Sequence, residues 1–346
     1  MFFIFSGYLK DEQEAAALNP LLSIRDLSIA FGKKPNQVVV TDNVTFDIYP
    51  GEILALVGES GCGKSVTAMS ILGLLPRQAR ILSGEILYGE KDLLHLNAQQ
   101  LDQVRGKDIS MIFQDIMYSL NPVFTIGNQL REGMRRHLHI SREEADHRAL
   151  ELLTRTGIQD ASDVLKKFPH QLSGGQRQRV MITMALSCGP KLLIADEPTT
   201  ALDVTIQLQI IQLLRSLCEE TGMAIFLITH DIGLVSEIAD RIIVMYAGQC
   251  VEVGPAREVL THPRHAYTDA LLRAVPDINH NHDHLLSIPG NIPERYDRLH
   301  GCRFSPRCSA VSNCPFRKLP ELEEVAPGHF SRCPTYGKKV YSDTNS

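Results

Sequence analysis

The segment Gly-Glu-Ser-Gly-Cys-Gly-Lys-Ser at residues 58–65 constrains the fold of this chain more than any other feature. It fits the pattern G-x-x-x-x-G-K-S/T, in which backbone N–H groups of a glycine-rich loop cradle phosphate groups. An apolar run at 53–57 precedes it, and a helical apolar pattern over 63–75 follows it. This order of strand, loop and helix is the one such a loop requires, so the segment predicts a phosphate site in an α/β fold.

The whole loop is expected to contact a bound nucleotide, through Gly58, Glu59, Ser60, Gly61, Cys62, Gly63, Lys64 and Ser65. Lys64 is expected to reach the β- and γ-phosphates, and Ser65 to ligate Mg²⁺. Cys62 is interpreted as a small filler residue rather than an activated thiol, although alkylation there should block the nucleotide.

An acidic pair follows a second buried strand. The apolar residues 192–195 lead directly into Asp196 and Glu197. In α/β proteins, sites lie at the carboxyl ends of the strands. Asp196 is therefore expected to hold Mg²⁺ through water, and Glu197 to polarise an attacking water molecule.

The remaining pattern predicts a parallel sheet with an inserted helical part. Apolar runs at 191–195 and 223–228 each follow a helical segment, at 174–187 and 204–219 respectively. The stretch of about 98–170 is mostly helical and polar, and it begins one helix with a capping box at residues 141–144. Three parts are predicted: a leader at 1–20, a main domain at 21–260 and a C-terminal extension at 261–346.

Charge and apolar composition indicate which kinds of partner the chain does not have. The chain has 35 Lys and Arg against 40 Asp and Glu, a net charge of −5, which is unlike a nucleic-acid-binding protein. Its apolar runs are far shorter than the ~20 residues that span a bilayer. The apolar N-terminus lacks a preceding positive region and is not read as a signal peptide. A cytoplasmic protein is expected.

Residues 172–176 read Leu-Ser-Gly-Gly-Gln and open a helix without a preceding strand. Glycines at a helix N-terminus form a second anion-binding site, and one nucleotide has no use for two such sites in one chain. Together with residues 58–65, this segment resembles the ATP-binding cassette (ABC) family, whose signature is LSGGQ. The resemblance covers about residues 21–255 and implies an ABC-type nucleotide-binding domain of the P-loop NTPase fold, with a helical subdomain.

The resemblance assigns further residues one by one. Phe31 matches the aromatic that stacks on adenine, Gln114 matches the Gln loop, Asp203 lies in the loop at the dimer interface, and His230 matches the switch histidine. In the family two cassettes dimerise head to tail, so Ser173, Gly174 and Gly175 would contact ATP bound to the partner. The implied catalytic set is Lys64, Gln114, Glu197 and His230, and the implied Mg²⁺ ligands are Ser65, Gln114 and Asp196.

Two regions resemble the dipeptide/oligopeptide importers more closely, residues 113–122 and several stretches within 262–308. The match departs from the family pattern at Ile116 and Ala266. The resemblance implies an ATPase that powers peptide uptake at the cytoplasmic face of the plasma membrane. Its partners would be a second ABC ATPase (a copy or a paralogue), two membrane permeases and, indirectly, a solute-binding protein. An importer of nickel, a metal chelate or another small solute is the alternative, and a non-transport ABC ATPase is a more distant one. The three histidines in residues 279–284 are read as part of a polar linker.

Four of the eight cysteines gather near the C-terminus, at Cys302, Cys308, Cys314 and Cys333. Disulfides do not suit a reducing compartment, and structural zinc favours closer spacing than five residues between cysteines. Four thiolates on wider loops suit an iron–sulfur cluster. Members of the peptide-importer family carry a 4Fe–4S cluster on such a tail, and the resemblance implies one here.

Overall fold

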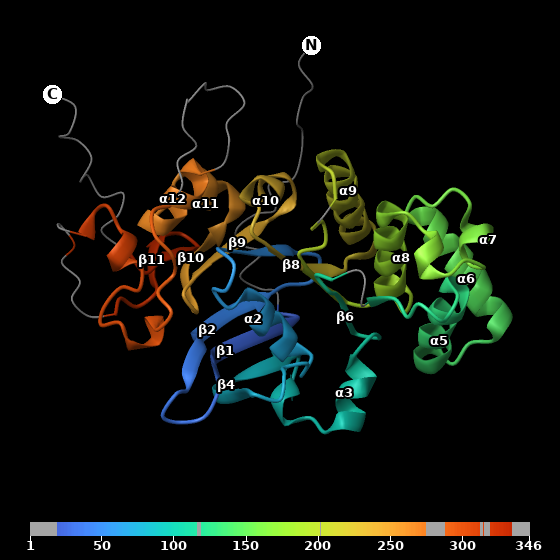
Figure 1. Cartoon of the computed structure of the whole chain (residues 1–346), viewed down its shortest axis with the longest axis horizontal. Helices are drawn as coiled ribbons and strands as arrows, with labels where there is room; N and C mark the ends of the chain where they lie inside the picture. The colour runs from blue at the N-terminus through green and yellow to red at the C-terminus, as the bar shows by residue number, and fades with distance from the viewer. Residues whose placement is uncertain are drawn as a thin grey trace, which may run out of the picture.

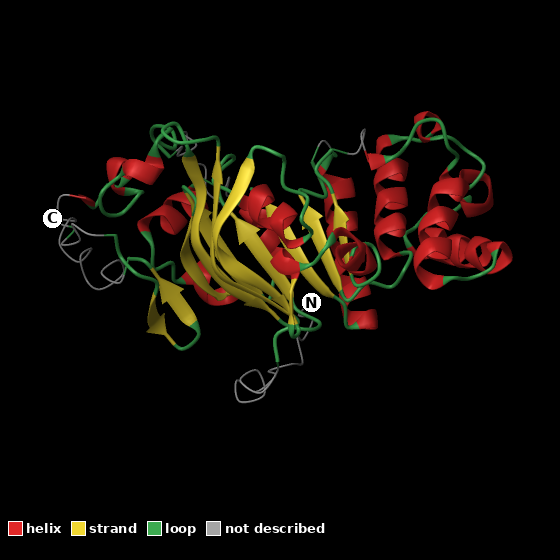
Figure 2. Cartoon of the chain, turned by 90° about the horizontal axis from the view of Figure 1, so that it is seen from below, coloured by secondary structure: helices red, strands yellow, loops and turns green. Residues whose placement is uncertain are grey.

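The structure is a computed structural model, and it describes residues 19–115, 119–200, 202–274, 288–311, 314 and 319–333. Most of the leader and the histidine-containing linker at 279–284 lie outside these ranges, as do Ile116 and Ala201. The strands form two sheets, which lie against each other in the centre of the molecule (Figures 1 and 2).

The smaller sheet is antiparallel and has the order β2-β1-β4-β5. Its strands are β1 (Leu22–Phe31), β2 (Val38–Ile48), β4 (Ala79–Tyr88) and β5 (Lys91–Asp92). In β1 and β2, apolar side chains on one face are buried while several on the other face are polar, which is the usual pattern of a sheet covered on one side. These strands form a layer beside the larger sheet.

The larger sheet has eight strands in the order β11-β12-β10-β9-β3-β8-β7-β6. Its strands are β3 (Ile53–Val57), β6 (Ile109–Ile112), β7 (Leu192–Asp196), β8 (Ala224–Thr229), β9 (Arg241–Tyr246), β10 (Gln249–Pro255), β11 (Glu323–Ala326) and β12 (His329–Ser331). Strands β9, β3, β8, β7 and β6 run parallel. Every residue of β3, β7 and β8 is buried, which confirms the prediction of strands covered on both faces.

The helices are α2 (Lys64–Ile71), α3 (Ala98–Val104), α5 (Ile126–Leu138), α6 (Arg142–Arg155), α7 (Ala161–Val164), α8 (Gly174–Leu186), α9 (Val204–Thr221), α10 (Ile232–Ile238), α11 (Ala256–Thr261) and α12 (Ala266–Arg273). Single turns of 3₁₀ helix are η1 (Leu93–His95), η2 (Pro169–Gln171), η3 (Tyr296–Arg298) and η4 (Ser305–Arg307). Helix α6 begins at the predicted capping box, with Ser141 and Glu144 bonded reciprocally. Helices α5, α6 and α7 gather beside α8 at one end of the molecule (Figure 1).

Among the described residues, the core consists of three apolar clusters packed against the faces of the larger sheet. One joins the sheet to α5, α6, α8 and α9, and a second fills the space between the two sheets. In the second cluster the rings of Phe46 (β2) and Phe226 (β8) lie 5.3 Å apart between centroids. The packing of both sheets on one cluster fixes β3, the strand that carries the phosphate loop.

The C-terminal part packs on the far side of β9 and β10. Tyr246, Tyr267 and Phe304 share the third cluster, with ring centroids 4.6 to 5.3 Å apart. Hairpin β11–β12 then extends the larger sheet, because β12 pairs antiparallel with β10. Within the described ranges, no helix combines the length and apolarity needed to cross a membrane.

Candidate active site

The phosphate loop connects β3 to α2, and at two of its glycines neighbouring backbone leaves no room for a side chain. At Gly58 (φ 156°), an added Cβ would lie 2.1 Å from the carbonyl oxygen of Met245. At Gly63 (φ 110°), it would lie 2.9 Å from the carbonyl oxygen of Val40. Gly61 instead faces open space, with no atom within 4 Å of an added Cβ. The loop is thus clamped at its ends by backbone and open in its middle, as a cradle for phosphate must be.

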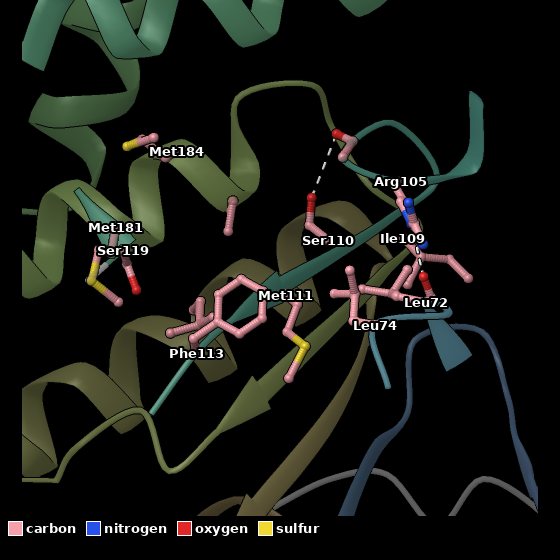
Figure 3. A pocket seen from close by; sticks show the side chains of 13 residues that line it. Leu72, Leu74, Arg105, Ile109, Ser110, Met111, Phe113, Ser119, Met181 and Met184 are labelled. Carbon is pink, nitrogen blue, oxygen red and sulfur yellow. Dashed lines mark hydrogen bonds between the residues drawn. The ribbon is translucent and has the colours of Figure 1, made fainter. Parts of the chain in front are cut away.

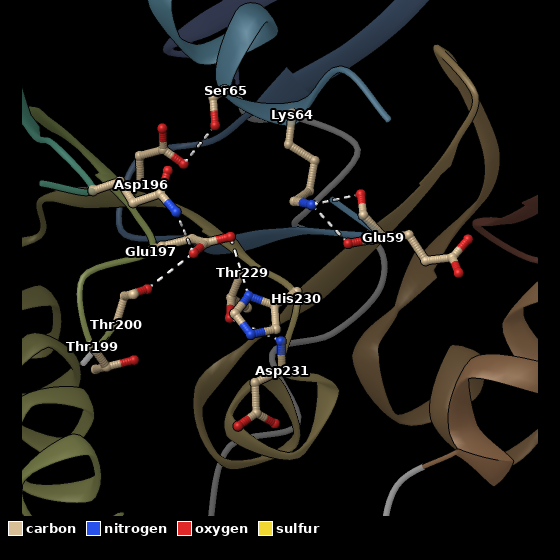
Figure 4. A network of polar contacts seen from close by, with 12 residues as sticks. Glu59, Lys64, Ser65, Asp196, Glu197, Thr199, Thr200, Thr229, His230 and Asp231 are labelled. Carbon is tan, nitrogen blue, oxygen red and sulfur yellow. Dashed lines mark hydrogen bonds and ion pairs between the residues drawn. The ribbon is translucent and has the colours of Figure 1, made fainter. Parts of the chain in front are cut away.

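Lys64 lies over this loop. Its Nζ donates to the carbonyl oxygens of Gly58 at 2.7 Å and Glu59 at 3.1 Å, and the side chain is 5% exposed (Figure 4). The buried cation therefore belongs to the loop itself and is held close to where phosphate oxygens would bind. Beside it, burial raises the pKa of the Cys62 thiol despite the Lys64 charge, which favours the interpretation of Cys62 as an inert filler residue.

Ser65 and Asp196 bring a hydroxyl and a carboxylate oxygen together across the site. The Ser65 hydroxyl donates to Asp196 Oδ1 at 3.1 Å, although the residues lie 131 positions apart in sequence (Figure 4). Burial raises the pKa of Asp196, and the neighbouring Glu197 adds to this effect. A buried carboxylate beside a hydroxyl is the donor set that Mg²⁺ prefers, and a divalent cation here would offset the burial of the charge. The residues present therefore fit Mg²⁺.

Glu197 is the centre of a hydrogen-bond network. Its Oε2 accepts from Gln114 Nε2 at 2.8 Å. Its Oε2 also accepts from Thr200 Oγ1 at 2.9 Å, and its Oε1 lies 3.1 Å from His230 Nδ1 (Figure 4). Burial would raise the pKa of Glu197, but the hydrogen bonds from His230 and Thr200 outweigh it and lower the pKa. The carboxylate is thus ionised, as a general base must be before it accepts a proton, and it is oriented from three different segments.

The backbone at Glu197 has an unusual conformation, with φ at 47°. Left-handed backbone is uncommon at residues other than glycine, and such strain gathers at functional sites. The N–H of Glu197 donates to Ile228 O on neighbouring β8 at 2.8 Å, which fixes this turn at the end of β7. The strained turn aims the carboxylate out of the sheet edge, next to Ser65 and Asp196.

Other predicted residues lie away from this network. Phe31 ends β1 and is partly buried, while Asp203 caps α9 by accepting from Ile206 N at 3.0 Å. Ser173 caps α8, and Ser173 and Gly174 are exposed. Figure 1 places α8 with the helical group and α2 beneath the larger sheet. The chain therefore brings Lys64, Ser65, Gln114, Asp196, Glu197 and His230 together but leaves the 173–175 segment facing outward.

A groove lies beside Gln114, with a volume of about 300 Å³. Its walls come from the end of α2, strand β6 and helix α8 (Figure 3). Phe113 and Leu74 line it and are 43% and 37% exposed, which is unusual for large apolar side chains at a concave surface. The groove joins the Gln114 segment to the helical group.

Three contributors to the site were not predicted from sequence: Thr200, Tyr267 and Arg307. Thr200 lies three residues after Glu197, a spacing that could have been noticed in a turn after a strand. Tyr267 and Arg307 contact the phosphate loop from more than 200 residues away, and no local pattern marks such a contact.

Taken together, a phosphate loop, a hydroxyl and carboxylate pair that fits Mg²⁺, and an oriented carboxylate define a P-loop ATPase site. Family models match residues 41–200, as "ABC transporter", and residues 251–314, as "Oligopeptide/dipeptide transporter, C-terminal region". The chain belongs to the ABC transporter family of ATP-binding subunits.

Two relatives cover nearly the whole chain. The oligopeptide transport ATP-binding protein AppD of Bacillus subtilis is 46% identical over 320 residues, spanning 92% of this chain and 98% of AppD. The dipeptide transport ATP-binding protein DppD of Escherichia coli is 45% identical over 313 residues, spanning 90% and 96%. Among solved structures, the dimeric post-hydrolysis state of the cassette MJ0796 bound to ADP and Pi matches with a TM-score of 0.62 and 29% identity, over 68% of this chain and 99% of that one. The ABC fold predicted from the motifs is confirmed.

Proposed function

We propose that this chain is the ATP-hydrolysing subunit of an importer for dipeptides or oligopeptides. The observation that carries the proposal is the Glu197 network, which places an ionised carboxylate beside the phosphate loop. The peptide cargo rests on AppD and DppD, to which the chain is similar over nine-tenths of its length.

In this proposal each residue of the site has one task. Lys64 and the loop N–H groups bind the β- and γ-phosphates of ATP, and Mg²⁺, when held by Ser65 and Asp196, neutralises phosphate charge. Gln114 and His230 hold Glu197 so that one carboxylate oxygen faces the attacking water and takes its proton. Phe31 stacks on the adenine ring. Chemistry of this kind depends on positioning and charge stabilisation more than on covalent catalysis.

The site is completed by a second ATPase subunit. Ser173, Gly174 and Gly175 cap an outward-facing helix N-terminus, whose orphan N–H groups suit an anion from another molecule. We infer a head-to-tail dimer in which this segment contacts the γ-phosphate of ATP on the partner, with Asp203 near the shared surface. The partner is a second copy or a paralogue.

The groove beside Gln114 is assigned to a membrane partner. An amphipathic helix of a permease subunit would fill its apolar walls, and a shift of that helix would reach Gln114 and thereby Glu197. The chain then works as a peripheral protein on the cytoplasmic face of the plasma membrane, with two permeases and, indirectly, a solute-binding protein.

Cys302, Cys308, Cys314 and Cys333 are proposed to hold a 4Fe–4S cluster. Burial raises the pKa of the Cys302 thiol to about 11, and the other three thiols add to this effect because they lie close by. All four are partly exposed and none forms a disulfide. In the part of the chain that the structure describes, no group of three or more His, Cys, Asp or Glu residues is placed where it could hold a metal ion. The proposal therefore rests on the resemblance to the peptide importers and on the wide spacing of the four cysteines in the sequence, which suits a cluster better than zinc.

The function is tested with Glu197→Gln, which keeps the shape of the side chain but cannot take a proton. We expect ATP binding to persist, hydrolysis to fall by at least about a hundredfold, and a nucleotide-bound dimer to accumulate. Unchanged turnover would overturn the assignment. Peptide uptake by cells that carry the matching permeases tests the cargo.

The cluster is tested by anaerobic purification and a visible absorption spectrum. A brown protein with about four irons per chain is expected, and its colour should vanish in a Cys302→Ser variant. A colourless protein with stoichiometric zinc would refute the cluster.

A further inference from the structure

The phosphate loop carries an acidic residue that the hydrolysis mechanism does not use. Glu59 follows Gly58 directly, and its carboxylate points away from the Lys64 ammonium group (Figure 4). The Glu59 side chain is 29% exposed, so solvent screens its charge only partly. A carboxylate in a loop that must bind a polyphosphate repels the ligand unless another group neutralises it.

Arg307 of the C-terminal part supplies this neutralising charge. Its Nη1 donates to Glu59 Oε2 at 2.6 Å and its Nη2 to Glu59 Oε1 at 2.9 Å, which is the bidentate geometry of a strong pair. The Arg307 side chain is 4% exposed, and its guanidinium lies 5.7 Å from the centre of the Tyr246 ring. Carbonyl oxygens of Pro289 and Ile288 accept further bonds at 2.9 and 3.3 Å. These contacts with Tyr246, Pro289 and Ile288 hold the Arg307 side chain in place independently of Glu59.

A second contact from the same part of the chain holds the backbone of the loop. The hydroxyl of Tyr267, on α12, accepts the N–H of Glu59 at 2.9 Å, and Tyr267 is fully buried. The side chain and the N–H of Glu59 are thus both bound from beyond residue 260. This part of the chain sets the conformation and the charge of one side of the phosphate loop.

We propose that Arg307 is a positioning residue for ATP binding. It cancels the charge of Glu59 and thereby raises the affinity of the loop for nucleotide. Arg307 immediately precedes Cys308, so the geometry also links the cysteine-bearing segment to the ATP site. The inference rests on the ATPase activity proposed above and goes beyond it, because it names a determinant of nucleotide affinity outside the cassette motifs.

The test is Arg307→Ala in the full chain, with the ATPase parameters kcat and KM and the binding of a fluorescent ATP analogue measured together. Removal of the guanidinium exposes the phosphates to the uncompensated Glu59 charge. We expect KM and the analogue dissociation constant to rise about tenfold, while kcat at saturating ATP changes less than about twofold. High salt should reduce the difference in KM between Arg307→Ala and the unaltered chain, because salt screens the repulsion between Glu59 and the phosphates.

The decisive variant is the double substitution Glu59→Gln with Arg307→Ala. It removes both charges, so KM should return to within about threefold of the unaltered chain. Arg295→Ala is the matched control, because Arg295 also anchors the C-terminal part, by donating to Gln37 O at 3.1 Å, but does not bond to Glu59 in the structure. Its KM should not change.

Two results would overturn the proposal. One is an unchanged KM in folded Arg307→Ala, and the other is a KM in the double variant as high as in Arg307→Ala alone. The second result would mean that the arginine serves folding alone. Absence of ATP hydrolysis by the unaltered chain would instead refute the proposed function. Binding of the fluorescent ATP analogue would still test the effect of Arg307 on nucleotide affinity.

Discussion

His265 offers a pH-dependent test of how the C-terminal part is built. It caps α12, with its Nδ1 accepting the N–H of Tyr267 at 3.1 Å, and it is 1% exposed. Burial lowers the pKa of His265 from 6.5 to about 3, and the charge of Arg332 adds to the effect. The folded protein therefore keeps this ring neutral well below pH 6.5.

The size of the pH effect on the free energy of unfolding follows from proton linkage. The unfolded chain binds this proton near the ordinary pKa, so acid favours the unfolded state. The stabilisation is complete above the unfolded pKa of about 6.5 and is lost as the pH falls toward the folded pKa of about 3. Between about pH 8 and pH 5 the free energy of unfolding should fall by about 2 kcal/mol from this group alone.

The assay is urea unfolding of the full chain over this pH range, beside His265→Asn. Asparagine can accept the same capping bond but does not titrate, and the other histidines titrate alike in both proteins. We expect the variant to be less stable at about pH 8, and this deficit to shrink by about 2 kcal/mol on acidification to about pH 5. If the free energy of unfolding changes equally with pH in the two proteins, the His265 ring is not the source of the predicted pH dependence.

Two further substitutions and one labelling experiment probe other contacts. Gly58→Ala should weaken nucleotide binding at least about tenfold in a titration, since its Cβ would meet Met245 O at 2.1 Å; ordinary affinity would contradict this geometry. His329→Ala removes the 2.7 Å contact to the fully buried Glu252 and should lower the free energy of unfolding by about 3 kcal/mol, whereas a loss near zero would mean that this buried pair contributes little to stability. Maleimide should label Cys62 slowly at neutral pH, because burial raises the pKa of its thiol, and mass spectrometry measures the rate of labelling. Rapid labelling would indicate an activated thiol.

Local patterns predicted the elements that carry the nucleotide. The apolar run at 53–57 became β3 with the same bounds, and Gly63 and Lys64 begin α2 as expected. The helix predicted over 63–75 ends earlier, at Ile71, because Gly73 takes a left-handed conformation before Pro76 is reached. Strand, loop and helix are specified within a short stretch, so neighbouring residues suffice to predict them.

Pairings between distant segments could not be predicted in this way. The order of eight strands, with β12 beside β10, depends on contacts made across the whole chain. The contacts of Glu59 with Tyr267 and Arg307 join residues more than 200 positions apart. Both partners lie in stretches that resemble the C-terminal extension of peptide importers, but that resemblance does not indicate which residues reach the phosphate loop. Sequence patterns report local periodicity, whereas these contacts depend on tertiary packing.

The pairing of β12 with β10 has a consequence for attempts to shorten the protein. Strand β10 is covered on one side by β9 and on the other by a strand from residues 329–331. Cutting the chain after α12 would uncover the N–H and C=O groups of β10 and leave an edge open to pairing with other molecules. We therefore expect a truncated protein to aggregate, whereas a tag added after residue 333 leaves this edge protected.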